Sequence, residues 1–170
     1  GTGGVEMNTD APFKQHRTAV VDVDSLYYKA CPPGTEPRIE ECLDLLQMLI
    51  GKWVRRAFCS STLVCLSGPD NFRKKVDPEY KANRKGKQRP IHLAAMEEFI
   101  KSQYPTACHP NLEADDVAGI ACTSGRLESP VLVGIDKDLD TVPCIRFNPD
   151  KMDFPTENTE GNAAKWLFCQ

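Results

Sequence analysis

Acidic residues recur in this sequence in small groups whose spacing is typical of metal-binding sites. Three groups lie at residues 22–24, 113–116 and 136–138, and a single Asp70 stands between the first two. Acidic residues at the start of a helix also interact favourably with the helix dipole, which is the simplest explanation of any one group. Several carboxylates gathered in one place, however, repel one another unless cations neutralise them.

The ligand types indicate which metal such a site would hold. Carboxylate oxygens are the ligands that Mg²⁺ and Mn²⁺ prefer. The eight cysteines include no Cys-x-x-Cys pair and the three histidines are scattered, so the sequence does not favour a zinc site. Two hard cations about 4 Å apart would suit hydrolysis of a phosphodiester, because they activate water and stabilise the leaving oxygen.

The elements around these residues predict how they come together. Apolar runs predict strands at 17–24, 62–67, 106–109, 131–135 and 144–147, and helical patterns predict helices at 25–30, 39–58, 91–103 and 162–170. Alternating helices and continuous apolar strands predict an α/β fold, a mostly parallel central sheet flanked by helices. Acidic residues follow every predicted strand but the last, so we expect them to share the ligand-binding edge of the sheet.

The acidic group at 113–116 stands where a further helix is expected to begin. If the helix includes Glu113, then Glu113 and Asp116 lie toward the face that Val117 and Ile120 bury. Asp115 is expected to point away from that face.

The charge of the chain is unevenly distributed. The net charge is −3, but residues 72–89 hold eight Lys and Arg against two acidic residues, which leaves −9 for the rest of the chain. Tyr80 lies among these cations, and such interleaving offers phosphate contacts together with a ring on which a base can stack. We expect a polyanion to bind this basic segment, with contacts from Arg73, Lys74, Lys75, Tyr80, Lys81, Arg84, Lys85 and Lys87.

Length and composition predict a single domain. The chain has 170 residues and no apolar run of about 18 residues that would cross a membrane. Residues 1–17 are polar and rich in Gly, without the apolar core of a signal peptide, and are expected to form a flexible N-terminal arm. Residues 18–170 are expected to form the catalytic domain, and the reducing cytoplasm is the compartment that these features favour.

Five segments together resemble the phage-type 5′ exonuclease and flap endonuclease family, relatives of the 5′-nuclease domain of bacterial DNA polymerase I. They are residues 20–26, 70–75, 77–85, 112–117 and 134–139, in the family's order and spacing. Pro-Glu-Tyr-Lys-Ala-Asn-Arg in the third and Glu-Ala-Asp-Asp in the fourth are highly specific in combination. The resemblance extends over residues 18–170 and implies a 5′-nuclease fold of the PIN-like kind.

The resemblance also implies an activity and a set of residues. A family member uses two Mg²⁺ or Mn²⁺ ions to cleave DNA at 5′ ends and flaps, and RNA primers paired to DNA, in the cytoplasm of the bacterial host when phage-encoded. Lys81 and Arg84 would contact the scissile phosphate and stabilise its developing charge, and Asp24 would orient its neighbours. The implied metal ligands are Asp22, Asp70, Glu113, Asp115, Asp116, Asp136 and Asp138.

The sequence departs from the family pattern in two places. Val23 replaces the usual Gly after the first Asp. The family's Gly-Asp-x-x-Asp motif, which supplies two further carboxylates, and its helix–turn–helix element, which grips duplex DNA, would follow a segment such as 166–170, where this sequence ends. We therefore expect a C-terminally truncated or split enzyme with an incomplete second metal site, and a second polypeptide that supplies the remainder.

Three other functions remain open. Asp22 and Asp24 match the Asp-x-Asp signature of haloacid-dehalogenase-type phosphatases, with Asp22 as nucleophile, although such enzymes would not need the basic segment. A PIN-type ribonuclease would share the acidic sheet edge but not the segment at 77–85. A non-catalytic DNA-binding or assembly module would account for the missing carboxylates.

Overall fold

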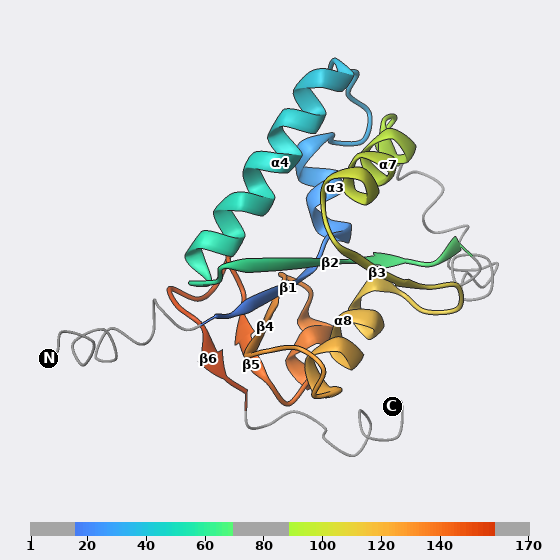
Figure 1. Cartoon of the computed structure of the whole chain (residues 1–170). Coiled ribbons are helices and arrows are strands. Elements are labelled where there is room, and N and C mark those ends of the chain that lie inside the picture. Colours follow the sequence, from blue (N-terminus) through green and yellow to red (C-terminus); the bar gives the residue numbers. More distant parts are fainter. Residues whose placement is uncertain (1–15, 70–88, 159–170) are drawn as a thin grey trace, which may run out of the picture.

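The computed structural model describes residues 16–69 and 89–158, which form a central sheet with helices on both faces (Figure 1). The sheet has the order β3-β2-β1-β4-β5-β6; the neighbours from β3 to β5 pair in parallel, and β6 pairs with β5 in the antiparallel direction. The predicted α/β fold is therefore confirmed. The strands are β1 (Thr18–Asp22), β2 (Ser61–Ser67), β3 (Thr106–His109), β4 (Pro130–Val133), β5 (Ile145–Phe147) and β6 (Thr156–Glu157).

Helices cover both faces of the sheet, which explains why the strands are apolar throughout rather than alternating between apolar and polar residues. The helices are α3 (Asp24–Ala30), α4 (Ile39–Arg56) and α7 (Leu93–Gln103) on one face, α8 (Ala114–Thr123) on the other, and a short 3-10 helix, η1 (Lys137–Thr141). Successive side chains of a strand point to opposite faces. Val21 of β1 accordingly packs with the α3, α4 and α7 layer, whereas Val20 packs with α8 and η1.

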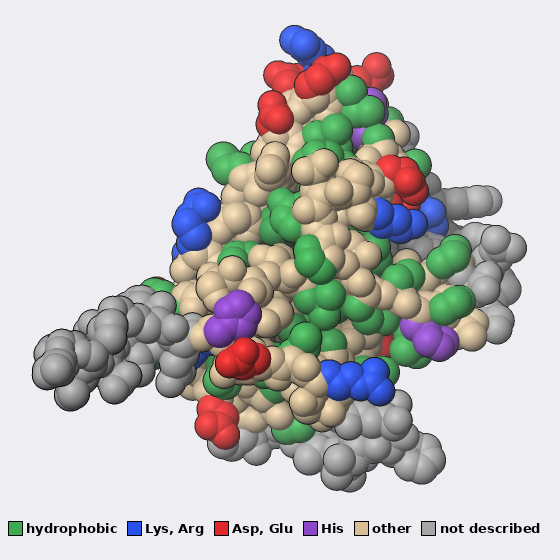
Figure 2. All heavy atoms as spheres, viewed as in Figure 1, with side chains coloured by type: hydrophobic (Ala, Val, Ile, Leu, Met, Phe, Trp, Pro, Cys, Tyr) green, Lys and Arg blue, Asp and Glu red, His purple; other side chains and the backbone are tan. Residues whose placement is uncertain are grey.

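The longest helix, α4, has favourable charges at both ends. The Glu41 side chain accepts a hydrogen bond from the backbone N–H of Arg38 at 3.2 Å. Glu40 and Glu41 lie in the first turn, and Arg55 and Arg56 lie in the last, which complements the helix dipole. Acidic side chains gather on the surface at the end of the molecule where α4 begins (Figure 2). This helix covers the sheet beside α3, the element that follows the first acidic strand end.

The element boundaries differ from the predicted ones in ways that affect the site. The first strand ends at Asp22, because the Asp22 side chain accepts a hydrogen bond from the Asp24 N–H at 3.3 Å and the chain turns at once into α3. The helices predicted at 39–58 and 91–103 span Ile39–Arg56 and Leu93–Gln103. The short antiparallel strand β6 was not predicted.

Some predictions fall on residues outside the described ranges. These are the helix at 162–170 and nearly all of the arm at 1–17, so the predicted domain boundaries stay predictions. Within residues 16–69 and 89–158, no helix is long and apolar enough to cross a membrane.

Candidate metal centre

A pocket of about 320 Å³ opens where the carboxyl ends of β1 and β4 lie beside the start of α8. Ligands of open parallel sheets bind at this edge. The pocket brings together carboxylates from segments far apart in the sequence, as expected from the acidic residues that follow the predicted strands. Its lining consists of Asp22, Asp24, Ser25, Glu113, Asp115, Ile135 and Asp136.

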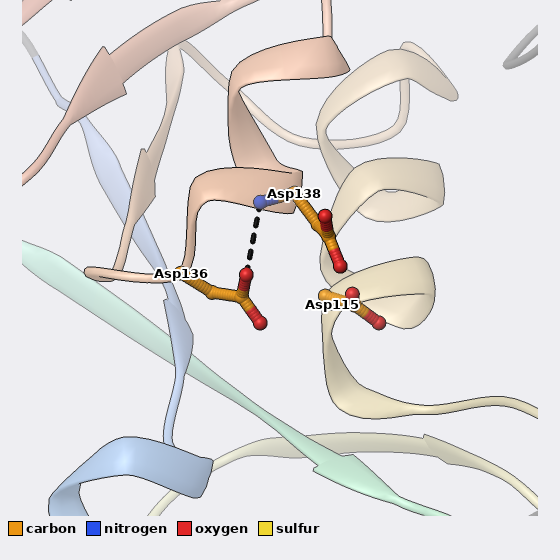
Figure 3. A group of neighbouring side chains, drawn as sticks. All are labelled: Asp115, Asp136 and Asp138. Carbon is orange, nitrogen blue, oxygen red and sulfur yellow. Dashed lines mark hydrogen bonds between the residues drawn. The ribbon is translucent and has the colours of Figure 1, made fainter.

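Three carboxylates come close enough to share one cation, and we call them the aspartate trio: Asp115, Asp136 and Asp138. Each offers an oxygen, and these oxygens lie within 4.8 Å of one another. Figure 3 shows the side chains converging from the start of α8 and from the turn into η1. The Asp138 N–H donates to Asp136 Oδ1 at 2.9 Å, which orients the Asp136 carboxylate. An all-oxygen donor set of this kind fits Mg²⁺ or Mn²⁺.

Asp22 lies at the buried end of the pocket and is only 6% exposed. Burial raises the pKa of Asp22 well above its usual range, and the neighbouring charges of Asp24, Asp115 and Asp136 raise it further. The hydrogen bond from the Asp24 N–H acts in the opposite direction. A carboxylate in such surroundings is stabilised in its charged form when a cation binds beside it.

Asp24 is tied to two neighbouring elements by its side chain. Its Oδ2 accepts a hydrogen bond from Ser67 Oγ at 2.7 Å, and Ser67 Oγ in turn accepts one from the Ala114 N–H at 2.9 Å. This chain of hydrogen bonds joins the start of α3, the end of β2 and the start of α8. Burial raises the pKa of Asp24 to about 6, and the Ser67 hydrogen bond partly offsets that effect.

The orientation predicted for Asp115 is wrong. Helix α8 begins at Ala114, so Glu113 is its N-cap residue with extended backbone, rather than a helical residue on the same face as Asp116. Asp115 in the first turn lines the pocket and belongs to the trio. Burial, followed by the charges of Asp116 and Glu113, raises the pKa of Asp115 to about 6.

The predicted site residues divide into two sets. Among the described residues, the pocket and the trio bring together Asp22, Glu113, Asp115, Asp136 and Asp138, together with Asp24. Asp116 stands beside them, half-buried, with its N–H donating to Asp115 Oδ1 at 2.8 Å. Outside the described residues lie Asp70, Arg73, Lys74, Lys75, Tyr80, Lys81, Arg84, Lys85 and Lys87.

Sequence reasoning overlooked three residues at this edge: Ser25, Ser67 and Arg146. Ser67 is the last residue of β2, so its position at the carboxyl end of an apolar strand could have identified it. Arg146 interrupts an apolar strand and is 3% exposed. A lone charge within a buried strand is a signal that a specific partner exists.

Two phage exonucleases are similar in sequence to part of this chain. No protein-family model matches the chain. The chain is 35% identical over 83 residues to the exodeoxyribonuclease of Enterobacteria phage T3 and 35% identical over 85 residues to the exonuclease of Escherichia phage T7. Each match covers 45% of this chain and 28% of the phage protein.

Solved structures share the fold. A structure of the phage T5 5′-exonuclease with bound zinc has a TM-score of 0.54 and 23% identity, over 84% of this chain and 58% of that one. The T5 D15 protein crystallised with metal ions has a TM-score of 0.52 and 24% identity, over 79% and 56%. The resemblance to the phage 5′-exonuclease family is confirmed. At these identities the structural likeness establishes the fold, and this chain spans less than two thirds of each phage protein.

Proposed function

We propose that this chain is the catalytic part of a metal-dependent 5′ nuclease that hydrolyses phosphodiesters at DNA 5′ ends and flaps, and in RNA primers paired to DNA. The observation that carries the proposal is the aspartate trio, whose oxygens lie within 4.8 Å of one another at the ligand-binding edge of the sheet. The sequence similarity to two phage exonucleases supports it. The T5 5′-exonuclease, which shares the fold, binds divalent metal ions.

The residues of the pocket have distinct parts in this proposal. The aspartate trio would hold one Mg²⁺ or Mn²⁺, with Asp22 as a buried neighbour. Glu113 and Asp70 are further ligands in the set that the sequence predicts for two ions. A bound cation of this kind activates water and stabilises the leaving oxygen. Asp24 and Ser67 hold the ends of the surrounding elements in place through their hydrogen bonds.

The phosphate-binding part of the proposal depends on the basic segment. Lys81 and Arg84 would contact the scissile phosphate, and Tyr80 with the neighbouring cations would contact the nucleic acid. These assignments are predictions from the sequence. They are tested by replacing Lys81 and Arg84 singly with Gln, which should lower the cleavage rate more than it lowers Mn²⁺ affinity.

Cleavage of a 5′-labelled flap DNA in the presence of Mg²⁺ or Mn²⁺ tests the proposal directly. Asp115→Asn keeps an acceptor for the Asp116 N–H but removes a charge from the trio. We expect the cleavage rate to fall at least about 100-fold, because changes to residues that only support metal ligands typically cost about 10–100-fold. Asp44→Asn on the exposed face of α4 makes the same change in net charge and should leave cleavage unchanged.

Substrate comparison separates the proposal from its rivals. Cleavage of single-stranded RNA but not of flap DNA would favour a PIN-type ribonuclease, and metal-independent DNA binding without cleavage would favour a binding module. The predicted second polypeptide is tested in the same assay. Full activity of this chain alone at ordinary enzyme concentrations would contradict that prediction.

A further inference from the structure

Arg146 is a buried cation that the proposed chemistry does not use. It lies in β5 between Ile145 and Phe147, and its side chain is 3% exposed. Arginine is rarely buried this deeply unless its donors are paired. Its partners therefore indicate what it does.

The guanidinium holds both ends of the segment that leads from β4 into the trio. Nη1 donates to the carbonyl oxygens of Gly134 at 2.7 Å and Phe147 at 2.8 Å. Nη2 donates to the carbonyl oxygen of Asp136 at 3.2 Å, and Nε donates to Asp140 Oδ1 at 3.3 Å. One planar side chain thus spans residues 134–136, where the chain leaves the sheet.

The carbonyl of Asp136 is the point on which two members of the trio depend. It also accepts the Leu139 N–H at 3.1 Å, the hydrogen bond that forms the first turn of η1. Asp138 lies within that turn, and its N–H donates to the Asp136 side chain. Fixing the Asp136 carbonyl therefore fixes the main chain from which both carboxylates extend, and it places the Asp138 N–H that orients the Asp136 carboxylate.

The other end of the segment is also in close contact with the site. Gly134 packs so tightly against β1 that a Cβ added there would lie 3.2 Å from the Asp22 Cβ. Its N–H continues the pairing with β5 by donating to the Phe147 carbonyl at 3.2 Å. A shift of the segment would therefore move Asp136 relative to Asp22.

We propose that Arg146 is a positioning residue of the metal centre, which fixes the main chain of residues 134–136 so that Asp136 and Asp138 meet Asp115 before a cation binds. This inference rests on the proposed metal-dependent function. The planar fork of arginine is required because Nη1 and Nη2 donate to different carbonyls at the same time, which a lysine ammonium cannot reproduce in that geometry.

Arg56 provides a matched comparison within the same chain. Its Nη1 and Nη2 donate to the carbonyls of Pro149 at 2.9 Å and Met152 at 3.1 Å, and its guanidinium lies 5.2 Å from the centre of the Phe147 ring. It therefore anchors a loop by the same means. None of these partners lines the pocket or belongs to the trio.

The test measures Mn²⁺ affinity of the full chain by the loss of the free-Mn²⁺ electron paramagnetic resonance signal. We compare the wild type with Arg146→Met, Arg146→Lys and Arg56→Met, and monitor folding of each by circular dichroism. Arg146→Met should weaken Mn²⁺ binding about 10–100-fold, as removal of an outer-shell partner typically does. Arg146→Lys should recover the fold yet remain several-fold weaker than the wild type, and Arg56→Met should bind Mn²⁺ as the wild type does.

Each result decides the inference. Wild-type affinity in Arg146→Lys would show that charge alone suffices and would overturn the positioning role. Equal losses in Arg146→Met and Arg56→Met would assign both arginines to general stability and overturn it as well. If Arg146→Met does not fold, Arg146→Lys takes its place, and wild-type affinity or a loss no greater than that of Arg56→Met overturns the inference.

The same titration separates this inference from the proposed function. A wild-type chain that binds no Mn²⁺ overturns the metal centre, and the role of Arg146 with it. A wild-type chain that binds Mn²⁺ but cleaves no nucleic acid overturns the nuclease function alone, and the variants then still decide the role of Arg146.

Discussion

Replacing Asp24 with Asn should stabilise the metal-free protein. Burial is the main cause that raises the pKa of Asp24 from its ordinary value of 3.8 to about 6, and the charges of Glu113, Glu97 and Asp136 add to it. The folded chain therefore has to hold Asp24 charged at neutral pH in surroundings that disfavour the charge. Asn removes the charge and keeps an oxygen that can accept the hydrogen bond from Ser67 Oγ.

The magnitude follows from the pKa difference. A shift of about two pKa units corresponds to about 3 kcal/mol at a pH above both values. The pKa of about 6 already includes the hydrogen bond from Ser67 to the carboxylate. Asn replaces the uncharged carboxyl group imperfectly, so we expect a net gain of about 1–3 kcal/mol in the free energy of unfolding at pH 8.

The pH dependence gives the sign of the effect. The folded state takes up the proton at about pH 6 and the unfolded state at about 3.8, so the wild type gains stability as the pH falls through this window. The charge penalty of about 3 kcal/mol at pH 8 should therefore fall by about half at pH 5 and be largely gone near pH 4, and the advantage of the Asn variant should fall with it.

Urea denaturation in EDTA at pH 8 and pH 5 checks both expectations. Asp44→Asn, an exposed residue of α4, makes the same change in net charge and should stay within about 0.5 kcal/mol of the wild type. The reasoning would be refuted by an Asp24→Asn variant that is less stable than the wild type at pH 8. An advantage of equal size at both pH values would refute it as well.

Two glycine substitutions test the close approaches around the pocket. Gly134→Ala would place a Cβ 2.6 Å from Leu139 Cδ1 and 3.2 Å from the Asp22 Cβ. We therefore expect the free energy of unfolding, measured by urea denaturation, to fall by about 1–3 kcal/mol, and Mn²⁺ binding to weaken. Gly68→Ala would collide with the His109 carbonyl and the backbone of Pro110, which cannot yield as a side chain does. We expect the free energy of unfolding to fall by about 3 kcal/mol or more, and a variant with wild-type stability would contradict this close contact.

The strands and the acidic edge could be predicted from the sequence because both follow from burial. A strand covered by helices on both faces is apolar at every position, as in Val20 and Val21, and its end is marked by the first charged residue. In a parallel sheet these ends share one edge. The approximate position of Asp22 and Asp136 therefore needed no knowledge of the packing.

The orientation of individual side chains could not be predicted in the same way. Successive residues of a helix differ by about 100° in direction, so a small error in the buried face changes which carboxylate is expected to lie near it. The prediction placed Ile120 on that face, whereas α8 buries Ala114, Ala118 and Cys122 beside Val117. Arg146 was overlooked for a different reason. Three of its partners are backbone carbonyls, which every residue possesses and no sequence pattern marks.

Carboxylates that repel one another have to be held in place by hydrogen bonds that leave their negative charge available to a cation. The N–H groups of Asp24, Asp116 and Asp138 each donate to the carboxylate of a neighbouring acidic residue, which orients that side chain while the charge remains. Arg146 directs three of its four hydrogen bonds to carbonyls and its fourth to Asp140. Burial first, and then the charges of neighbouring carboxylates, raise the pKa of Asp22 and of Asp115. A divalent cation binding among these carboxylates would relieve the repulsion without moving them, which is the property a preorganised metal centre requires.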